Sequence, residues 1–221
     1  MRYIPKGSTE PPVLSEAKAK GEDYASFRGK SALNKILRED QGHICCYCQQ
    51  EIQHYHGTVS AGSSHNEHLQ PQHAYPTLQM EYGNLFASCN ADGKAGYCGH
   101  HKGNEEITDF IRRKDCREHF KYNVIGEILP EGSVYNRWEE YTKNYSSLSP
   151  SQQEAADAIR ILNLNHPFLV AERRKTIGDI LALAQGISSS QAQHKIAVIN
   201  RQTPLVRFVE AIIYFLNKKI P

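Results

Sequence analysis

The spacing of apolar residues predicts a helix near the start of the chain. Apolar side chains recur at roughly helical spacing ahead of Gly42, which predicts a helix over 28–40 that the glycine ends. Residues 1–20 are rich in Pro, Lys, Glu and Gly, and we expect them to form an extended arm. The residues that carry the helical pattern are Phe27, Leu33, Ile36 and Leu37.

The same pattern predicts regular elements in the second half of the chain. Residues 105–117 carry apolar side chains at helical spacing and predict a helix. Residues 120–130 have apolar residues on both sides of Gly126, which is typical of a small hairpin. Two later helices are predicted over 166–185 and 203–218.

The sequence Ser149-Pro150-Ser151-Gln152 has the features of a helix start. The serine can cap the first turn, the proline suits the first helical position, and the glutamine can reach back to the cap. This pattern predicts a further helix over 149–164.

The chain divides into three segments, and the fold class predicted is α+β. Residues 1–42 supply the N-terminal arm and helix. Residues 43–117 form a compact module whose first part is dense in Gly, His, Asn and Cys, and short strands and loops fit that part best. Residues 118–221 supply the hairpin and a mostly helical C-terminal region, which is either a docking surface for a partner or a structural cap on the module.

Composition gives little support for membrane or strong electrostatic binding. No apolar run reaches the roughly 18 residues of a membrane span, and the N-terminus lacks the apolar stretch of a secretory signal. We therefore expect a cytoplasmic protein that binds no membrane. The formal net charge is only +2, which by itself is a weak argument for nucleic-acid binding.

Five of the six cysteines fall between residues 45 and 98, which indicates metal or redox chemistry more than disulfides in a reducing compartment. Cys45 and Cys48 form one pair, and Cys89 and Cys98 form a second pair across a loop over 91–96. Four thiolates suit a tetrahedral structural Zn²⁺ site, which would stabilise a module poor in apolar residues. The alternatives are reduced thiols packed in a core, or Cys46 as the ligand in place of Cys45. Cys116 is expected to be a buried small side chain.

The segments ICCYCQQEI, EHLQP, NLFASC and CGHHKGN follow one another in an order that resembles the HNH endonuclease motif with its ββα-metal fold. The resemblance implies phosphodiester hydrolysis with Mg²⁺ or Mn²⁺ as the catalytic ion. His68 would be the general base, because an imidazole titrates near physiological pH, and Glu67 would bind the ion on the opposite face of the strand. Asn84 would brace the loop that orients the base.

The third motif position lies on a helix and supplies the other ligand of the catalytic ion. The usual pattern has a histidine directly after the cysteine, but Gly99 stands there. The resemblance therefore gives His100 as the second ligand of the catalytic ion, with His101 as the alternative. Lys102 and His73 are expected to contact nucleic acid, and His65 is left open between a phosphate contact and a solvent-exposed side chain.

A closer similarity covers nearly the whole chain and includes FKYNVIGEILPEG and AIRILNLNHPFLVAERR. These segments resemble the nuclease subunit of Septu antiphage systems, some of which are associated with retrons. The resemblance implies an effector of antiviral defence with an ABC/SMC-like ATPase as its partner, and in retron systems also a reverse transcriptase and its DNA product. DNA is favoured over RNA as the substrate.

Two other classes of function remain open at this point. A catalytically inactive zinc-knuckle module would bind nucleic acid or the partner without cutting. A zinc-dependent redox or thiol protein would leave Glu67, His68 and Asn84 without a role.

Overall fold

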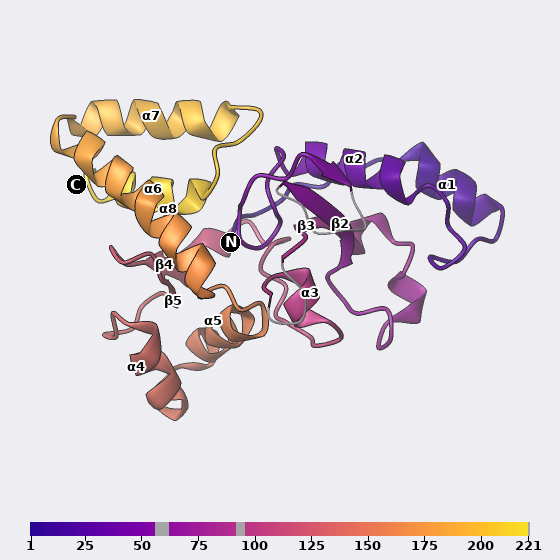
Figure 1. The fold of residues 1–221 in the computed structure, drawn as a ribbon, viewed down its shortest axis with the longest axis horizontal. Coiled ribbons are helices and arrows are strands. Elements are labelled where there is room, and N and C mark those ends of the chain that lie inside the picture. Colours follow the sequence, from indigo (N-terminus) through magenta and orange to yellow (C-terminus); the bar gives the residue numbers. More distant parts are fainter. Residues whose placement is uncertain (56–61, 92–95, 221) are drawn as a thin grey trace.

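Helices and two small sheets make up the computed structural model, which describes residues 1–55, 62–91 and 96–220 (Figure 1). The helices are α1 (Pro12–Ala19), α2 (Lys30–Asp40), α3 (Gly99–Lys102), α4 (Trp138–Lys143), α5 (Pro150–Ile161), α6 (Pro167–Gln185), α7 (Ser189–Arg201) and α8 (Val209–Asn217). The strands are β1 (His54–Tyr55), β2 (Ser63–His68), β3 (Leu85–Cys89), β4 (Phe120–Tyr122) and β5 (Ile128–Pro130). The predicted α+β class is confirmed.

The larger sheet has the order β1-β2-β3 and carries the candidate site. Strands β2 and β3 are antiparallel, with Ser64 opposite Cys89 and His68 opposite Leu85, and β1 runs parallel to β2. Helix α3 follows β3 in the chain, so two antiparallel strands lead into a short helix. Side chains alternate between the two faces of β2, which places Glu67 and its neighbour His68 on opposite faces.

Helix α2 packs against β2 through a buried polar contact. The Asn34 side chain donates a hydrogen bond from Nδ2 to Asn66 Oδ1 at 2.9 Å and accepts one at Oδ1 from Ser64 Oγ at 3.0 Å. All three side chains are buried, so these bonds satisfy groups that water does not reach. The contact fixes the face of β2 that also carries His68.

One hydrophobic cluster joins the N-terminal, central and C-terminal segments. Its members come from the arm, from the cysteine-rich module and from the C-terminal helices, so the module shares its core with the rest of the chain. Representative buried members are Met1, Leu14, Leu37, Phe86, Phe110, Phe120, Leu169 and Phe215. Within the described ranges, every helix falls short of the length and apolar character that a bilayer crossing requires.

Of the two elements predicted for the N-terminal segment, one needs correction and one is confirmed. The extended arm over 1–20 contains the helix α1, because Pro12 occupies a first-turn position that suits proline, and Leu14 and Ala17 are buried on one face. The helix predicted over 28–40 is confirmed as α2 and ends before Gly42, which has a φ of 63°.

The helix predicted over 105–117 is wrong. The segment runs through turns and reaches only a short 3-10 helix, Cys116–His119. Asp109 accepts bonds from the backbone N–H and the Nε of Arg112, and such local side-chain bonds compete with helical ones. The apolar residues of the segment are nevertheless buried. Their spacing therefore identified buried positions correctly but did not indicate a helix.

The predictions for the C-terminal half are largely confirmed. The hairpin is formed by β4 and β5, and α5 begins with the expected capping box between Ser149 and Gln152. Helix α6 matches the range predicted over 166–185, whereas α8 begins at Val209, later than predicted over 203–218. Helices α4 and α7 were not predicted, although α7 has its own capping box.

Residues 92–95 of the predicted loop over 91–96 lie outside the described residues.

We predict that Ser149→Ala lowers the free energy of unfolding by about 1 kcal/mol, because it removes the side-chain acceptor for the Gln152 N–H at the start of α5. Chemical denaturation monitored by circular dichroism measures this change. The control is Ser31→Ala, at an exposed position of α2, which should shift stability by less than about 0.5 kcal/mol. Equal effects of the two substitutions would contradict the capping role.

Candidate metal centre and active site

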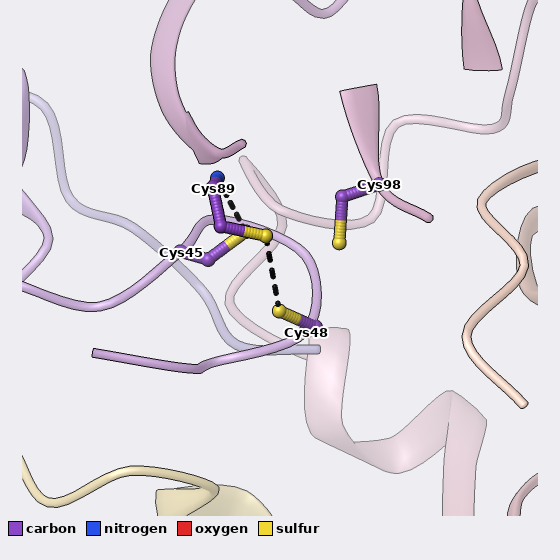
Figure 2. A group of neighbouring side chains, drawn as sticks. All are labelled: Cys45, Cys48, Cys89 and Cys98. Carbon is purple, nitrogen blue, oxygen red and sulfur yellow. Dashed lines mark hydrogen bonds between the residues drawn. The ribbon is translucent and has the colours of Figure 1, made fainter. Parts of the chain in front are cut away.

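Four cysteines converge on one buried point in the structure. The Sγ atoms of Cys45, Cys48, Cys89 and Cys98 all lie within 4.8 Å of one another, and all four side chains are buried (Figure 2). Cys48 Sγ and Cys89 Sγ are 3.6 Å apart, far longer than a disulfide bond. Zinc bonds of about 2.3 Å in a tetrahedron place two sulfurs about 3.8 Å apart, so the cluster fits a structural metal such as Zn²⁺.

Three separate chain segments bring the four thiols together. Cys45 and Cys48 lie in the turn after α2, Cys89 ends β3, and Cys98 immediately precedes α3. The turn is closed by the Cys45 N–H, which donates to the Gln50 carbonyl oxygen at 2.8 Å. Cys98 has a φ of 61°, a left-handed conformation that aims its Sγ at the other thiols (Figure 2).

Hydrogen bonds in the cluster favour an anionic sulfur at Cys45. The Cys89 backbone N–H lies 3.3 Å from Cys45 Sγ. Burial by itself would raise the pKa of Cys45, but the neighbouring thiols donate to its sulfur and hold the pKa well below its ordinary value. Burial raises the pKa of Cys98, so Cys45 and Cys98 differ in how readily each sulfur carries negative charge. A divalent cation at the centre would favour negative charge on each sulfur that binds it.

The two remaining cysteines lie outside the cluster. Cys46 and Cys116 are buried and free, and burial raises the pKa of each thiol above its ordinary range. Among the described residues, the four clustered cysteines are the one group of three or more His, Cys, Asp or Glu side chains close enough to share an ion. The structure therefore favours Cys45 over Cys46 as the fourth partner.

Glu67 is a buried carboxylate whose two oxygens have different surroundings. Oε1 accepts from Tyr47 Oη at 3.1 Å and pairs with Lys102 Nζ at 3.0 Å. Oε2 lies 3.4 Å from His65 Nε2. Burial alone would raise the pKa of Glu67, but the contact with His65 and the charge of Lys102 hold that pKa below its ordinary value.

His65 lies on the same face of β2 as Glu67, two residues earlier in the strand. Its Nδ1 is 2.8 Å from Asn90 Oδ1, and this carbonyl oxygen can only accept a hydrogen bond, so the proton lies on Nδ1. Burial works to lower the pKa of His65, yet the hydrogen bond and the charge of Glu67 outweigh it and raise the pKa. His65 and Glu67 therefore form a polar pair that Asn90 orients.

Gly99, the first residue of α3, makes room for this pair. A Cβ at that position would lie 2.6 Å from His65 Nε2 and closer still to Glu67 Oε2. The Gly99 backbone N–H donates to Ser88 Oγ at 3.1 Å, which holds α3 against β3. No larger residue fits at Gly99 unless the His65–Glu67 pair moves.

His68 ends β2 on the other face and is half-buried. Its Nε2 lies 2.9 Å from the Gln79 carbonyl oxygen. Gln72 Nε2 is also 2.9 Å from this nitrogen, but a side-chain amide can turn to present its oxygen, whereas the backbone carbonyl of Gln79 cannot. Because a carbonyl only accepts, the Gln79 contact favours a proton on Nε2 and a lone pair on Nδ1. Burial lowers the pKa of His68, which favours the neutral imidazole. Tyr24 packs edge-on against the ring, with centroids 4.5 Å apart.

Asn84 connects β3 to the loop that follows His68. Its Oδ1 accepts from the Gln70 N–H at 2.7 Å, and its Nδ2 donates to the carbonyl oxygens of Gln70 and Leu78 at 3.1 and 3.2 Å. These bonds position the loop whose Gln79 carbonyl contacts His68. Asn84 is thus hydrogen-bonded to both ends of the loop between Gln70 and Leu78.

The histidines of α3 point in different directions. His101 Nδ1 lies 2.8 Å from the Ile161 carbonyl oxygen at the end of α5, away from Glu67. His100 is exposed, with its Nε2 3.1 Å from Asn90 Oδ1 and its ring centroid 4.2 Å from that of His65. The structure thus brings His100 and not His101 to the Glu67 side, although His65 lies between His100 and the carboxylate.

The prediction of Lys102 as a phosphate contact needs correction. Its side chain is only 1% exposed, and its ammonium binds Glu67 Oε1 and donates to the His68 carbonyl oxygen at 2.9 Å. A lysine in this position braces the two strand residues instead of reaching solvent. His73 is exposed on the loop after β2, where the structure leaves it accessible.

The sequence reasoning did not assign His65, Asn90 or Tyr47 a definite role at the site. The signal for His65 was present, because residues two apart on a strand share a face and His65 is two residues from Glu67. Asn90 and Tyr47 could not be assigned, because their contacts depend on how the turn after α2 and the end of β3 pack together. No protein-family model matches the chain, and no curated protein matches it either.

We predict that the purified protein contains about one zinc ion per chain and that Cys98→Ser removes most of it, because one of four thiolate ligands is lost. Elemental analysis of the dialysed protein measures the metal content. Cys116→Ala is the matched control, since Cys116 is buried outside the cluster and should leave zinc unchanged. A wild-type protein free of zinc that stays folded would contradict a structural metal.

We also predict that Gly99→Ala lowers the free energy of unfolding by about 1–3 kcal/mol, because the added methyl group overlaps Glu67 Oε2 and His65 Nε2. The control is Gly178→Ala in α6, where a Cβ meets nothing within 4 Å and should be neutral or stabilising. Denaturant titrations compare the two. An unchanged stability in Gly99→Ala would show that the His65–Glu67 pair can move at little cost.

Proposed function

We propose that the chain is a metal-dependent endonuclease of the HNH type that hydrolyses phosphodiester bonds in nucleic acid, with DNA favoured over RNA. The observation that carries this proposal is the arrangement on β2. The strand presents a hydrogen-bonded neutral imidazole, His68, at its end, and a buried carboxylate, Glu67, on the opposite face. The sequence of two antiparallel strands and a short helix beside a four-cysteine cluster agrees with this type of site.

His68 acts as the general base in this proposal. With Nε2–H directed at the Gln79 carbonyl oxygen, Nδ1 accepts a proton from a water molecule. The oxygen of that water attacks phosphorus, the bond from phosphorus to the 3′ oxygen breaks, and the leaving 3′ oxygen takes a proton from solvent water. The products are a 5′-phosphate and a 3′-hydroxyl, and the imidazolium of His68 returns its proton to solvent. Asn84 keeps the imidazole in place through the loop, and Lys102 holds the His68 carbonyl oxygen.

Glu67 would hold a divalent ion such as Mg²⁺ or Mn²⁺ together with a nearby histidine, for which the family pattern gives His100. The carboxylate oxygen suits both ions, whereas the imidazole nitrogen suits Mn²⁺ better than Mg²⁺, which takes mainly oxygen ligands. When bound, the ion would polarise the phosphate and stabilise the leaving oxygen. Tyr47 and Lys102 fix the carboxylate so that only Oε2 faces the site.

The proposed partner is an ABC/SMC-like ATPase of an antiphage defence system, with a retron reverse transcriptase and its DNA product in some systems. The low net charge of +2 supports a need for a partner, because phosphate contacts dominate the affinity of proteins for nucleic acid. We propose that the ATPase captures or presents the substrate. The helical C-terminal region is the segment available for docking.

A second candidate is a catalytically inactive module that binds nucleic acid or the partner. The ion pair between Lys102 Nζ and Glu67 Oε1 favours it, because the charge of the carboxylate is already balanced without a divalent ion. Such a protein would keep its zinc and its fold and would not cut.

We predict that His68→Ala lowers the rate of plasmid cleavage with Mg²⁺ or Mn²⁺ by about 10²–10⁴-fold, because the base that activates water is lost. Supercoiled plasmid and total cellular RNA are incubated with wild type and variant, with and without the ATPase. The control is His194→Ala, an exposed histidine on α7 that should cut like wild type.

The outcomes separate the two candidates. Cutting by wild type and by His194→Ala, but not by His68→Ala, supports the nuclease. Silence of all three proteins with the ATPase present, together with intact zinc content and strong nucleic-acid binding, supports the inactive module instead. Cleavage of RNA alone would overturn the preference for DNA.

A further inference from the structure

We infer that His65, and not a histidine of α3, supplies the imidazole ligand that binds a divalent ion together with Glu67. This inference deepens the proposed function and rests on it for the role of the ion, although the binding site itself can be tested without any cleavage. The atoms assigned to the ion are His65 Nε2 and Glu67 Oε2.

The distance between these atoms suits two ligands of one ion. Ligands bound at about 2.1 Å lie about 3.0 Å apart at a right angle and about 3.4 Å apart at the tetrahedral angle. His65 Nε2 and Glu67 Oε2 are 3.4 Å apart. A hydrogen bond at this distance is weak, so the pair is spaced for a shared cation at least as well as for a shared proton.

Asn90 prepares His65 for this role. Nδ1 of His65 lies 2.8 Å from Asn90 Oδ1, which accepts a hydrogen bond from Nδ1–H and leaves the lone pair of Nε2 directed at Glu67. Histidine ligands of metals commonly donate their other ring N–H to a carbonyl or carboxylate in this way. An imidazole nitrogen and a carboxylate oxygen that face each other with lone pairs repel unless a cation or a proton lies between them.

Glu67 is also arranged to bind an ion through Oε2, because Oε1 already has two polar partners. Tyr47 and Lys102 both contact Oε1, and among the described residues the one polar partner of Oε2 is His65. The two contacts to Oε1 fix the rotation of the carboxylate. Oε2 is therefore held at the position from which it can bind an ion beside His65.

Gly99 explains why the ligand comes from the strand and not from the helix. The position directly after Cys98 has no side chain, and a Cβ there would collide with both ligand atoms. His65 Nε2 thus occupies the space that a side chain from the start of α3 would fill. His101 binds the end of α5, and His100 contacts Asn90 from the exposed side.

The surroundings leave the ion accessible from solvent. The side chain of His65 is 22% exposed, and the exposed His100 lies on the same side with its ring 4.2 Å from that of His65. Water or a phosphate oxygen can complete the coordination from this side. His100 then forms the rim of the site and could contact the ligand that enters.

Mn²⁺ binding to the zinc-loaded protein tests the inference. Loss of the free Mn²⁺ signal in electron paramagnetic resonance measures the affinity of wild type, His65→Ala and His100→Ala. We expect His65→Ala to weaken binding by at least roughly tenfold and His100→Ala to change it by less than about threefold. Zinc content and thermal melting establish that each variant is folded.

A second measurement tests the same inference without substituting His65. Pulsed electron paramagnetic resonance of Mn²⁺ in His100→Ala, a change at an exposed residue, should still show coupling to a histidine nitrogen. Loss of that coupling, an unchanged affinity in His65→Ala, or no Mn²⁺ binding by wild type would each overturn the inference.

Cleavage assays on the same proteins distinguish this inference from the proposed function. A protein that binds Mn²⁺ through His65 and cuts neither DNA nor RNA with the ATPase retains the metal site and contradicts the nuclease. If cleavage depends on His68 and Mn²⁺ binding is lost only in His100→Ala, the proposed nuclease function stands. The proposed role of His65 is then contradicted.

Discussion

The four-cysteine cluster is the constraint on which the candidate site depends. It joins the turn after α2, the end of β3 and the residue before α3 (Figure 2). Residues next to these cysteines contact Glu67 or its partner His65. Tyr47 lies between two of the cysteines, Asn90 follows the third, and Gly99 follows the fourth. A metal that holds the thiols together would therefore also fix the position of each group around the carboxylate.

Strand β2 places polar side chains in two different chemical environments. On one face, the partly exposed His65 and the buried Glu67 form a polar pair whose other atoms are held by Asn90, Tyr47 and Lys102. At the end of the strand, His68 faces the loop that Asn84 braces, and burial lowers its pKa. A base and an ion can thus be positioned by adjacent residues without competing for the same space.

Much of this site could be predicted from the sequence, because its signals are local. The Cys-x2-Cys pair and, elsewhere in the fold, the capping box at Ser149 each depend on short spacings that the chain preserves when it folds. The roles predicted for Glu67 and His68 stay predictions. The failures depend on tertiary contacts. Lys102 looked like a surface cation, but the ion pair with Glu67 draws it into the core. Residues 105–117 had helical spacing, but turns bury the same apolar side chains.

The central claim is that β2 and the cysteine cluster define two separate metal sites, and anomalous diffraction from crystals soaked in Mn²⁺ tests it most directly. The account predicts a peak at the zinc edge among the four Sγ atoms and a distinct manganese peak between His65 Nε2 and Glu67 Oε2. A manganese peak bound through His100 without His65, or no peak beside Glu67 at all, would contradict it.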